Sequence, residues 1–234
     1  MTTWWMVTVA MAGPAEDRVA EIVATRSQRN LDSAPTIERA AYDEALTGEV
    51  VTGLVEMEGS KARLAWGVGV VEQPADRFWA AVNDDRNKVA YTKLEHLELL
   101  EGDYCAPRRV VFQYLGVSLL TDRWWVVEQR HNTALAAATE GRLREMSWKS
   151  VADMPAALND SAKQWADKGM PLPFTEGSWL VADLGDGRTL VEYYAWSDPG
   201  GNVPARMASS FAAGGISDTF ATMAKLAAKG PTCL

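Results

Sequence analysis

The chain has 234 residues, 47% of them hydrophobic, and its 31 Asp and Glu outnumber its 23 Lys and Arg, for a formal net charge of -8. This length and apolar content allow one large domain with a full core. An acidic surface repels nucleic acid and anionic membranes, so we expect no nucleic-acid partner and only transient membrane contact.

The first 15 residues are apolar, with small residues at Ala10 and Ala12, and resemble a secretory signal, although no Lys or Arg precedes them. A buried N-terminal segment is the alternative. No apolar run reaches the roughly 18 residues that a membrane-spanning helix needs, so we expect a soluble protein, and a monomer. The compartment stays open between cytoplasm and periplasm, with the cytoplasm slightly favoured.

The first regular elements are helical. Apolar residues recur at three- and four-residue steps from Ala15 to Thr47, and Pro35 divides this stretch into two helices. We expect residues 1–47 to form an N-terminal segment and helices that pack on a domain of residues 48–234. That domain begins with a hairpin and a short amphipathic helix, over the ranges Glu49–Glu58, Lys61–Val71 and Pro74–Asn83.

Six strands and one polar excursion follow. Turn or polar residues separate the first four strands, and a Gly-Asp-Gly turn joins the last two. The excursion, Ala152–Gly177, contains a polar helical piece around Trp165. The predicted strands are Lys93–Glu101, Arg108–Leu115, Arg123–Asn132, Leu143–Val151, Ser178–Asp183 and Arg188–Ser197. Six of the ten tryptophans fall in predicted strands, at positions 66, 124, 125, 148, 179 and 196, so the sheet should carry much aromatic surface.

The last element is a long helix from Pro204 to about Ala228. Met207 and Phe211 lie on one face of it, while the apolar residues after position 215 lie nearly opposite. We therefore expect a kink at Gly214-Gly215.

Residues for catalysis or metal binding are sparse. The only histidines, His96 and His131, lie on separate predicted strands, so we expect no metal, no cofactor and no enzyme activity. Gly67-Val68-Gly69 indicates close backbone packing rather than a phosphate loop. Four strand carboxylates, Glu95, Glu98, Glu128 and Glu192, are expected to face solvent.

The two cysteines, Cys105 and Cys233, lack the spacing of a zinc site. We expect both to be unpaired small hydrophobic side chains, unless the fold brings them together.

Several runs in the C-terminal half resemble bacterial START domains, the steroidogenic-acute-regulatory-protein-related lipid-transfer family. These runs are Gly177-Ser178-Trp179, the turn from Leu184 to Thr189, Asp198-Pro199-Gly200-Gly201 before Pro204-Ala205, and the strand entry Thr121–Val127. The resemblance covers about Glu49 to the end. It implies an α+β helix-grip fold, in which a curved antiparallel sheet wraps around a long C-terminal helix and encloses an apolar cavity.

The resemblance also implies a function: non-catalytic binding and transfer of a lipid, sterol or phospholipid, with the C-terminal helix as a lid. The family's charged cavity residue falls near Gln129, which is neutral here. Strand alternation then places Trp125, Val127 and Gln129 on the cavity face, and Trp124, Glu128 and Arg130 on the other. The expected ligand-binding residues are Phe112, Tyr114, Trp125, Val127, Gln129, Trp148, Tyr194, Met207, Phe211 and Gly215.

Two other functions remain open. One is a cyclase or hydrolase on the same scaffold, which would need a charged cavity group such as Glu95 or Glu128. The other is a regulatory, partner-binding domain whose lumen is filled by its own tryptophans.

Overall fold

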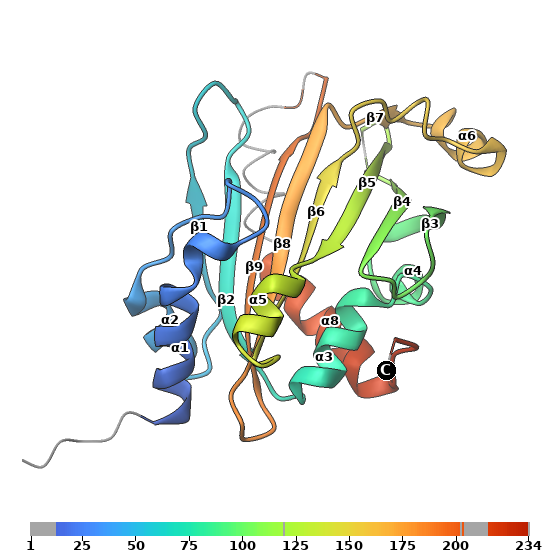
Figure 1. The fold of residues 1–234 in the computed structure, drawn as a ribbon. Coiled ribbons are helices and arrows are strands. Elements are labelled where there is room, and N and C mark those ends of the chain that lie inside the picture. The colour runs from blue at the N-terminus through green and yellow to red at the C-terminus, as the bar shows by residue number, and fades with distance from the viewer. Residues whose placement is uncertain (1–12, 119, 202, 204–214, 234) are drawn as a thin grey trace, which may run out of the picture.

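The computed structural model describes residues 13–118, 120–201, 203 and 215–233 (Figure 1). These residues form one nine-stranded sheet with the strand order β1-β2-β9-β8-β6-β5-β4-β3. All pairs in this path are antiparallel, and the two-residue β7 pairs with β5 in parallel. The strands are β1 Val51–Val55, β2 Leu64–Val71, β3 Leu94–Glu101, β4 Arg108–Leu115, β5 Arg123–His131, β6 Leu143–Ser150, β7 Met170–Pro171, β8 Phe174–Asp183 and β9 Thr189–Asp198.

Helices lie on both faces of the sheet and at its ends. The predicted pair of N-terminal helices is present, but an extended stretch separates them rather than a single break at Pro35. No helix of the described residues is long and apolar enough to cross a membrane. The helices are α1 Pro14–Ala24, η1 Arg26–Gln28, α2 Arg39–Ala45, α3 Ala75–Asn83, α4 Lys88–Tyr91, α5 Thr133–Ala138, α6 Asp160–Ala166 and α8 Ile216–Lys229.

The last helix, α8, ends where the sequence stops it. Gly230 takes a left-handed conformation with φ 89°, the usual end of a helix, and Pro231 follows. Met207, Phe211 and Gly214 lie outside the described residues, and so does the predicted kink.

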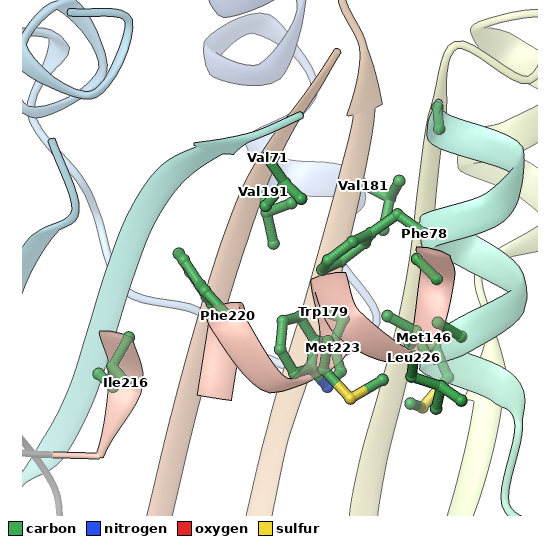
Figure 2. Close-up of a cluster of buried hydrophobic side chains, with 14 of the residues drawn as sticks. Val71, Phe78, Met146, Trp179, Val181, Val191, Ile216, Phe220, Met223 and Leu226 are labelled. Carbon is green, nitrogen blue, oxygen red and sulfur yellow. The ribbon is translucent and has the colours of Figure 1, made fainter. Parts of the chain in front are cut away.

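One face of the sheet packs against α8, and we call it the concave face. Two glycines of β2 permit close approach: a Cβ on Gly67 would lie 2.5 Å from the Ile216 side chain, and one on Gly69 would lie 3.1 Å from the Phe220 ring. The prediction that these glycines serve close backbone packing is therefore confirmed. Figure 2 shows Phe220 beside Trp179 and near Phe78 of α3, at the centre of the largest buried cluster.

The opposite, convex face is covered by the N-terminal segment. Val19 and Ile22 of α1 and Tyr42 of α2 form one buried cluster with Val68 and Leu180 of the sheet. Figure 1 shows α1 and α2 beside β1 and β2, while α3 and α8 lie at another side of the sheet. Both faces of the central strands are thus buried, which is uncommon for an antiparallel sheet.

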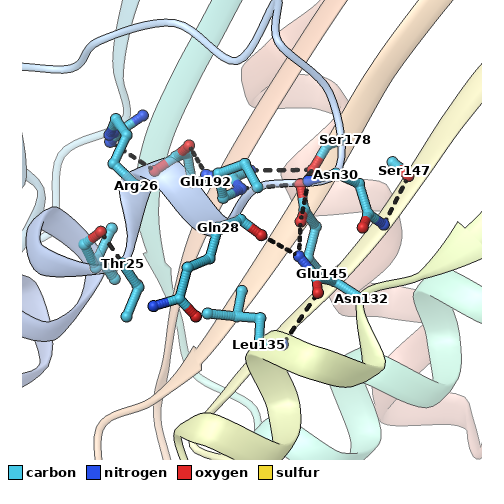
Figure 3. A network of polar contacts seen from close by, with 12 residues as sticks. Thr25, Arg26, Gln28, Asn30, Asn132, Leu135, Glu145, Ser147, Ser178 and Glu192 are labelled. Atoms are coloured by element: carbon cyan, nitrogen blue, oxygen red, sulfur yellow. Dashed lines mark hydrogen bonds and ion pairs between the residues drawn. The ribbon is translucent and has the colours of Figure 1, made fainter.

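A buried polar network holds the stretch between α1 and α2 on the convex face (Figure 3). The side chain of Arg29 is 3% exposed, and its Nε donates to Glu145 at 2.8 Å, its Nη1 to Glu192 at 2.5 Å and its Nη2 to the Ser178 hydroxyl at 3.0 Å. The Tyr42 hydroxyl donates to the second Glu192 oxygen at 2.6 Å. One guanidinium thus joins β6, β8 and β9, and Tyr42 links α2 to the same network through Glu192.

Glu192 was expected to face solvent, and this expectation is wrong, since the residue is 1% exposed. Burial alone would raise the pKa of the Glu192 carboxyl, but Arg29 and Arg26 outweigh burial and hold that pKa below its ordinary value.

The cysteines are paired, which corrects the expectation of two free thiols. Cys105, in the turn between β3 and β4, forms a disulfide with Cys233 beyond α8. The Thr232 backbone N–H and hydroxyl also donate to Asp84, each at 2.8 Å. The chain end after α8 is thereby tied to the loop after α3 and to the β3–β4 turn. Pairing across 128 residues could not be read from spacing alone.

Reducing the Cys105–Cys233 disulfide should lower the free energy of unfolding by about 4 kcal/mol, because the bond closes a long loop in the unfolded chain. For a chain of this size the melting temperature should fall by roughly 10 °C. Thermal denaturation with and without reductant measures the shift. A Cys105→Ser/Cys233→Ser variant should show no response to reductant, and two titratable thiols in the unreduced native protein would refute the pairing.

Replacing Arg29 with Met should destabilise the fold by about 3–5 kcal/mol, because buried Glu145 loses its cation and buried Glu192 keeps only Arg26. The loss should be larger at pH 8 than at pH 5. Without Arg29, only Arg26 and the Tyr42 hydrogen bond oppose burial, so the pKa of Glu192 in the folded state rises, and a group with a raised pKa loses stability as pH rises. Urea denaturation at both pH values measures it. Arg39→Met, in an exposed pair with Asp43, is the matched control and should leave stability nearly unchanged. Equal stability of the two variants would refute the role of Arg29.

Candidate ligand pocket

A pocket of about 380 Å³ lies between the concave face and the first turn of α8. Side chains from β4, β5, β6 and β9 form its wall, and Gly215, Ile216 and Thr219 close it on the helix side. Most of this lining is apolar, with the aromatic rings of Trp125, Trp148 and Tyr193. The lining described contains two arginines, Arg63 and Arg123, and no Asp or Glu.

Strand pairing decides which side chains reach the pocket. Residues directly opposite in an antiparallel pair share a face. Trp125 pairs with Gln113, and both line the pocket. Along β5 the same face continues through Val127 and Gln129, and Gln129 pairs with Trp148, which also lines the pocket. The predicted division of β5 between its two faces is therefore the one observed.

Phe112 and Tyr114 do not reach the pocket, which corrects their predicted placement. Phe112 pairs with Val126 and Tyr114 with Trp124, so all four belong to the outer face of β4 and β5. There they pack under α6. The Tyr114 hydroxyl donates to Asp122 at 2.7 Å. The face to which each β4 side chain points could not be predicted, because Val110, Val111, Phe112 and Tyr114 are all buried, on one face or the other.

Tyr194 is also placed elsewhere, whereas its neighbours Tyr193 and Ala195 line the pocket. Tyr194 pairs with Trp66 and Ser178, and Ser178 belongs to the Arg29 network on the convex face. Trp125, Trp148 and Gly215 are thus the predicted site residues that line the pocket. Met207 and Phe211 lie outside the described residues.

The Gly177-Ser178-Trp179 run serves three structural purposes. A Cβ on Gly177 would lie 2.3 Å from the Trp148 ring, so this glycine allows the ring to rest against β8. Ser178 donates to Glu145 at 2.9 Å on the convex face. Trp179 packs on Phe220 of α8. The motif positions a pocket wall, the convex network and the helix together.

Beside Gln129 lies a buried charged cluster that the sequence analysis missed. Asp85 accepts from Arg109 Nε and from Lys88 Nζ, at 2.5 Å and 2.7 Å. Gln129 Nε2 lies 3.5 Å from Asp85, and Gln129 Oε1 has no partner. Burial, and then the positive charge of Arg109, lower the pKa of nearby His131 to about 4, so this imidazole is neutral at pH 7. The polar run from Asn83 to Lys88 after an amphipathic helix was the available signal.

The carboxylates considered for catalysis do not line the pocket. Glu95 is exposed, Glu98 accepts from Asn159 at 2.6 Å, and Glu128 pairs with Arg108 and Arg130 on the outer face. Among the residues that the structure describes, no three His, Cys, Asp or Glu side chains are grouped as a metal site. The pocket therefore offers apolar surface, hydroxyl and amide groups, and guanidinium.

A curved sheet around a C-terminal helix, with a pocket between them, defines a helix-grip α+β protein, as the sequence predicted. No family model and no curated protein matches the chain. Solved structures do match, and they show that the chain has the START fold.

Human STARD10 matches with a TM-score of 0.64 and 12% identity, over 96% of this chain and 83% of that chain. The STAR-related lipid transfer protein from Xanthomonas axonopodis matches with a TM-score of 0.59 and 17% identity, over 76% and 93%. The Zhui aromatase/cyclase from Streptomyces sp. R1128 matches with a TM-score of 0.50 and 14% identity, over 71% and 94%. At these identities the likeness concerns the fold.

Proposed function

We propose that this protein binds a hydrophobic molecule, such as a lipid or sterol, in the pocket and carries it through water without chemical change. The observation that carries the proposal is the pocket itself, an apolar hollow of about 380 Å³ between sheet and helix. The START fold, shared with a protein named for lipid transfer, supports it. No cofactor is needed, and contact with a donor or acceptor membrane would be transient.

The energetics suit a carrier. A ligand that loses about 400 Å² of apolar surface to the pocket gains on the order of 10 kcal/mol before the costs of binding. The pocket volume lies near the lower end of the range of about 300–1,000 Å³ that is usual for small-molecule sites. At about 30 Å³ for each water-sized group, it holds on the order of a dozen such groups. This size favours a single hydrocarbon chain or a compact ring system over a two-chain phospholipid.

Several residues are proposed as ligand contacts. Trp125, Trp148 and Gly215 line the pocket, and Val127 and Gln129 lie farther along the same face of β5, outside the pocket lining. The unpartnered Oε1 of Gln129 suits a donor hydroxyl on the ligand or a bound water. Met207 and Phe211 on the last predicted helix, and a lid role for its first half, remain proposals.

The cyclase alternative keeps one support, the aromatase/cyclase of the same fold. Its proposed carboxylates do not line the pocket: Glu95 is exposed, and Glu128 pairs with Arg108 and Arg130. A pocket of this size also weighs against a partner-binding domain filled by its own tryptophans.

Native mass spectrometry tests the proposal on purified protein and on protein incubated with mixed liposomes, followed by extraction of the bound molecule. We expect one lipid-like molecule per chain. A clean ligand-free mass in both samples would overturn the carrier function, and a chemically altered ligand would support the cyclase.

Trp125→Ala should reduce ligand retention at least several-fold, because it removes part of the pocket wall, while a half-buried position limits the loss of stability. Phe112→Ala is the matched control: it removes an aromatic ring from the outer face of the neighbouring strand. It should destabilise the fold by about 3–5 kcal/mol and leave ligand retention unchanged at a temperature where the variant is folded. Equal retention by wild type and Trp125→Ala would exclude Trp125 as a contact.

A further inference from the structure

Arg123 is a buried cation in the pocket wall whose hydrogen bonds all go to neutral carbonyl groups. The residue is 7% exposed and begins β5. Its Nε donates to the Pro199 carbonyl at 2.6 Å, its Nη1 to the Thr121 carbonyl and to the Asp122 carbonyl at 3.4 Å, and its Nη2 to the Gly200 carbonyl at 3.4 Å. These bonds fix the guanidinium in place, yet none of them supplies a negative charge.

Other arginines with buried side chains are neutralised. Arg29 pairs with two glutamates, and Arg109 pairs with Asp85. Arg123 forms no ion pair with any carboxylate that the structure describes, and residues 204–214 contain no Asp or Glu. The carboxylate of Asp122, next in the chain, interacts with Arg123 only through space and accepts its hydrogen bonds from the Tyr114 hydroxyl and the Val117 N–H. A buried charge without a counter-ion is costly, so this position calls for an anion.

Polar groups gather at the same end of the pocket as Arg123. Antiparallel pairing through β6 places the start of β5, the start of β8 and the end of β9 at the same end of the sheet. Thr175 and Ser197, which line the pocket there, share one hydrogen bond of 2.6 Å between their hydroxyls, so one hydroxyl hydrogen remains to donate. Arg63 also lines this pocket, but it is half-exposed and pairs with Glu56. The acidic residues Glu58 and Asp198 line a neighbouring outer hollow instead.

The remainder of the pocket is apolar, with Trp148, Tyr193 and Ile216 in its wall. We infer that the ligand is a single-chain amphiphile with an anionic head, such as an alkyl carboxylate, whose head binds Arg123 while its chain lies against Trp148 and Ile216. This inference rests on the proposed carrier function and names its ligand class. Guanidinium suits a carboxylate because it donates two parallel hydrogen bonds.

Three probes of equal chain length test the inference on the wild-type protein: dodecanoate, dodecan-1-ol and dodecyltrimethylammonium, titrated at pH 7.4 by calorimetry. We expect dodecanoate to bind at least ten-fold tighter than the alcohol, and the cationic probe to bind most weakly. Most of the advantage of dodecanoate over the alcohol should persist at high salt, because a buried ion pair is screened much less than an exposed one.

Two variants locate the effect. Arg123→Gln should remove the preference for dodecanoate over dodecan-1-ol. The affinity of this variant for dodecan-1-ol should stay within about two-fold of wild type, and this unchanged affinity would show that the pocket is intact. Arg123→Lys keeps the positive charge and should retain part of the preference. Arg188→Gln, which removes a positive charge at the distant β8–β9 turn, is the matched control and should bind all three probes as wild type does.

The possible results distinguish a failure of the anionic-head inference from a failure of the proposed carrier function. Equal affinity of wild type for dodecanoate and dodecan-1-ol would overturn the anionic head while the carrier function stands. A dodecanoate preference that survives Arg123→Gln would overturn the role of Arg123. Failure of all three probes to bind would count against both the head group and the carrier of single chains.

Discussion

The contact of α8 with the two glycines of β2 determines how the rest of the concave face is used. Gly67 and Gly69 let Ile216 and Phe220 lie directly on the strand backbone, and the helix end is tied by Thr232 and the Cys105–Cys233 disulfide. The pocket lies beside the first turn of this helix, where Gly215, Ile216 and Thr219 face side chains of β4, β5, β6 and β9. The contact that holds Ile216 against Gly67 therefore also positions one wall of the pocket.

The convex face explains which parts of the fold the sequence could predict. Strand positions, the α3 helix and the close-packing glycines were predicted, because each depends on local pattern and turn residues. The faces to which the side chains of β4 and β9 point were not predicted. The N-terminal segment and α6 bury the outer faces of these strands, so polar and apolar residues do not alternate along them as they do in a strand with one exposed face. On β5 the exposed Arg130 and half-exposed Glu128 preserved that signal, and its two faces were assigned as observed. Phe112 and Tyr194 were misplaced for want of such markers.

Contacts between residues remote in sequence were the other feature that could not be predicted. Arg29 lies 116 residues from Glu145 and 163 from Glu192, and Cys105 lies 128 from Cys233. No spacing rule links such partners. Glu192 was therefore predicted to be solvent-exposed although it is buried, and the two cysteines were predicted to be free although they are paired. The START-like motifs did carry this tertiary information, since Gly177, Ser178 and Trp179 each serve a different part of the fold. A resemblance can therefore succeed where periodicity cannot.

The buried cations on the two sides of the sheet differ in how their charge is balanced. On the convex face, Arg29 and Arg26 meet Glu145 and Glu192, so each cation has a carboxylate. Such a network fixes one arrangement of the N-terminal segment, because every alternative leaves a charge unpaired. Neutral polar atoms without a partner occur on both sides: Ser33 Oγ, Trp124 Nε1 and the Tyr194 hydroxyl on the convex side, and Gln129 Oε1 on the concave side. The difference therefore concerns charge. In the pocket wall Arg123 is held by carbonyls alone, so an external anion would supply the carboxylate that Arg29 finds within the chain.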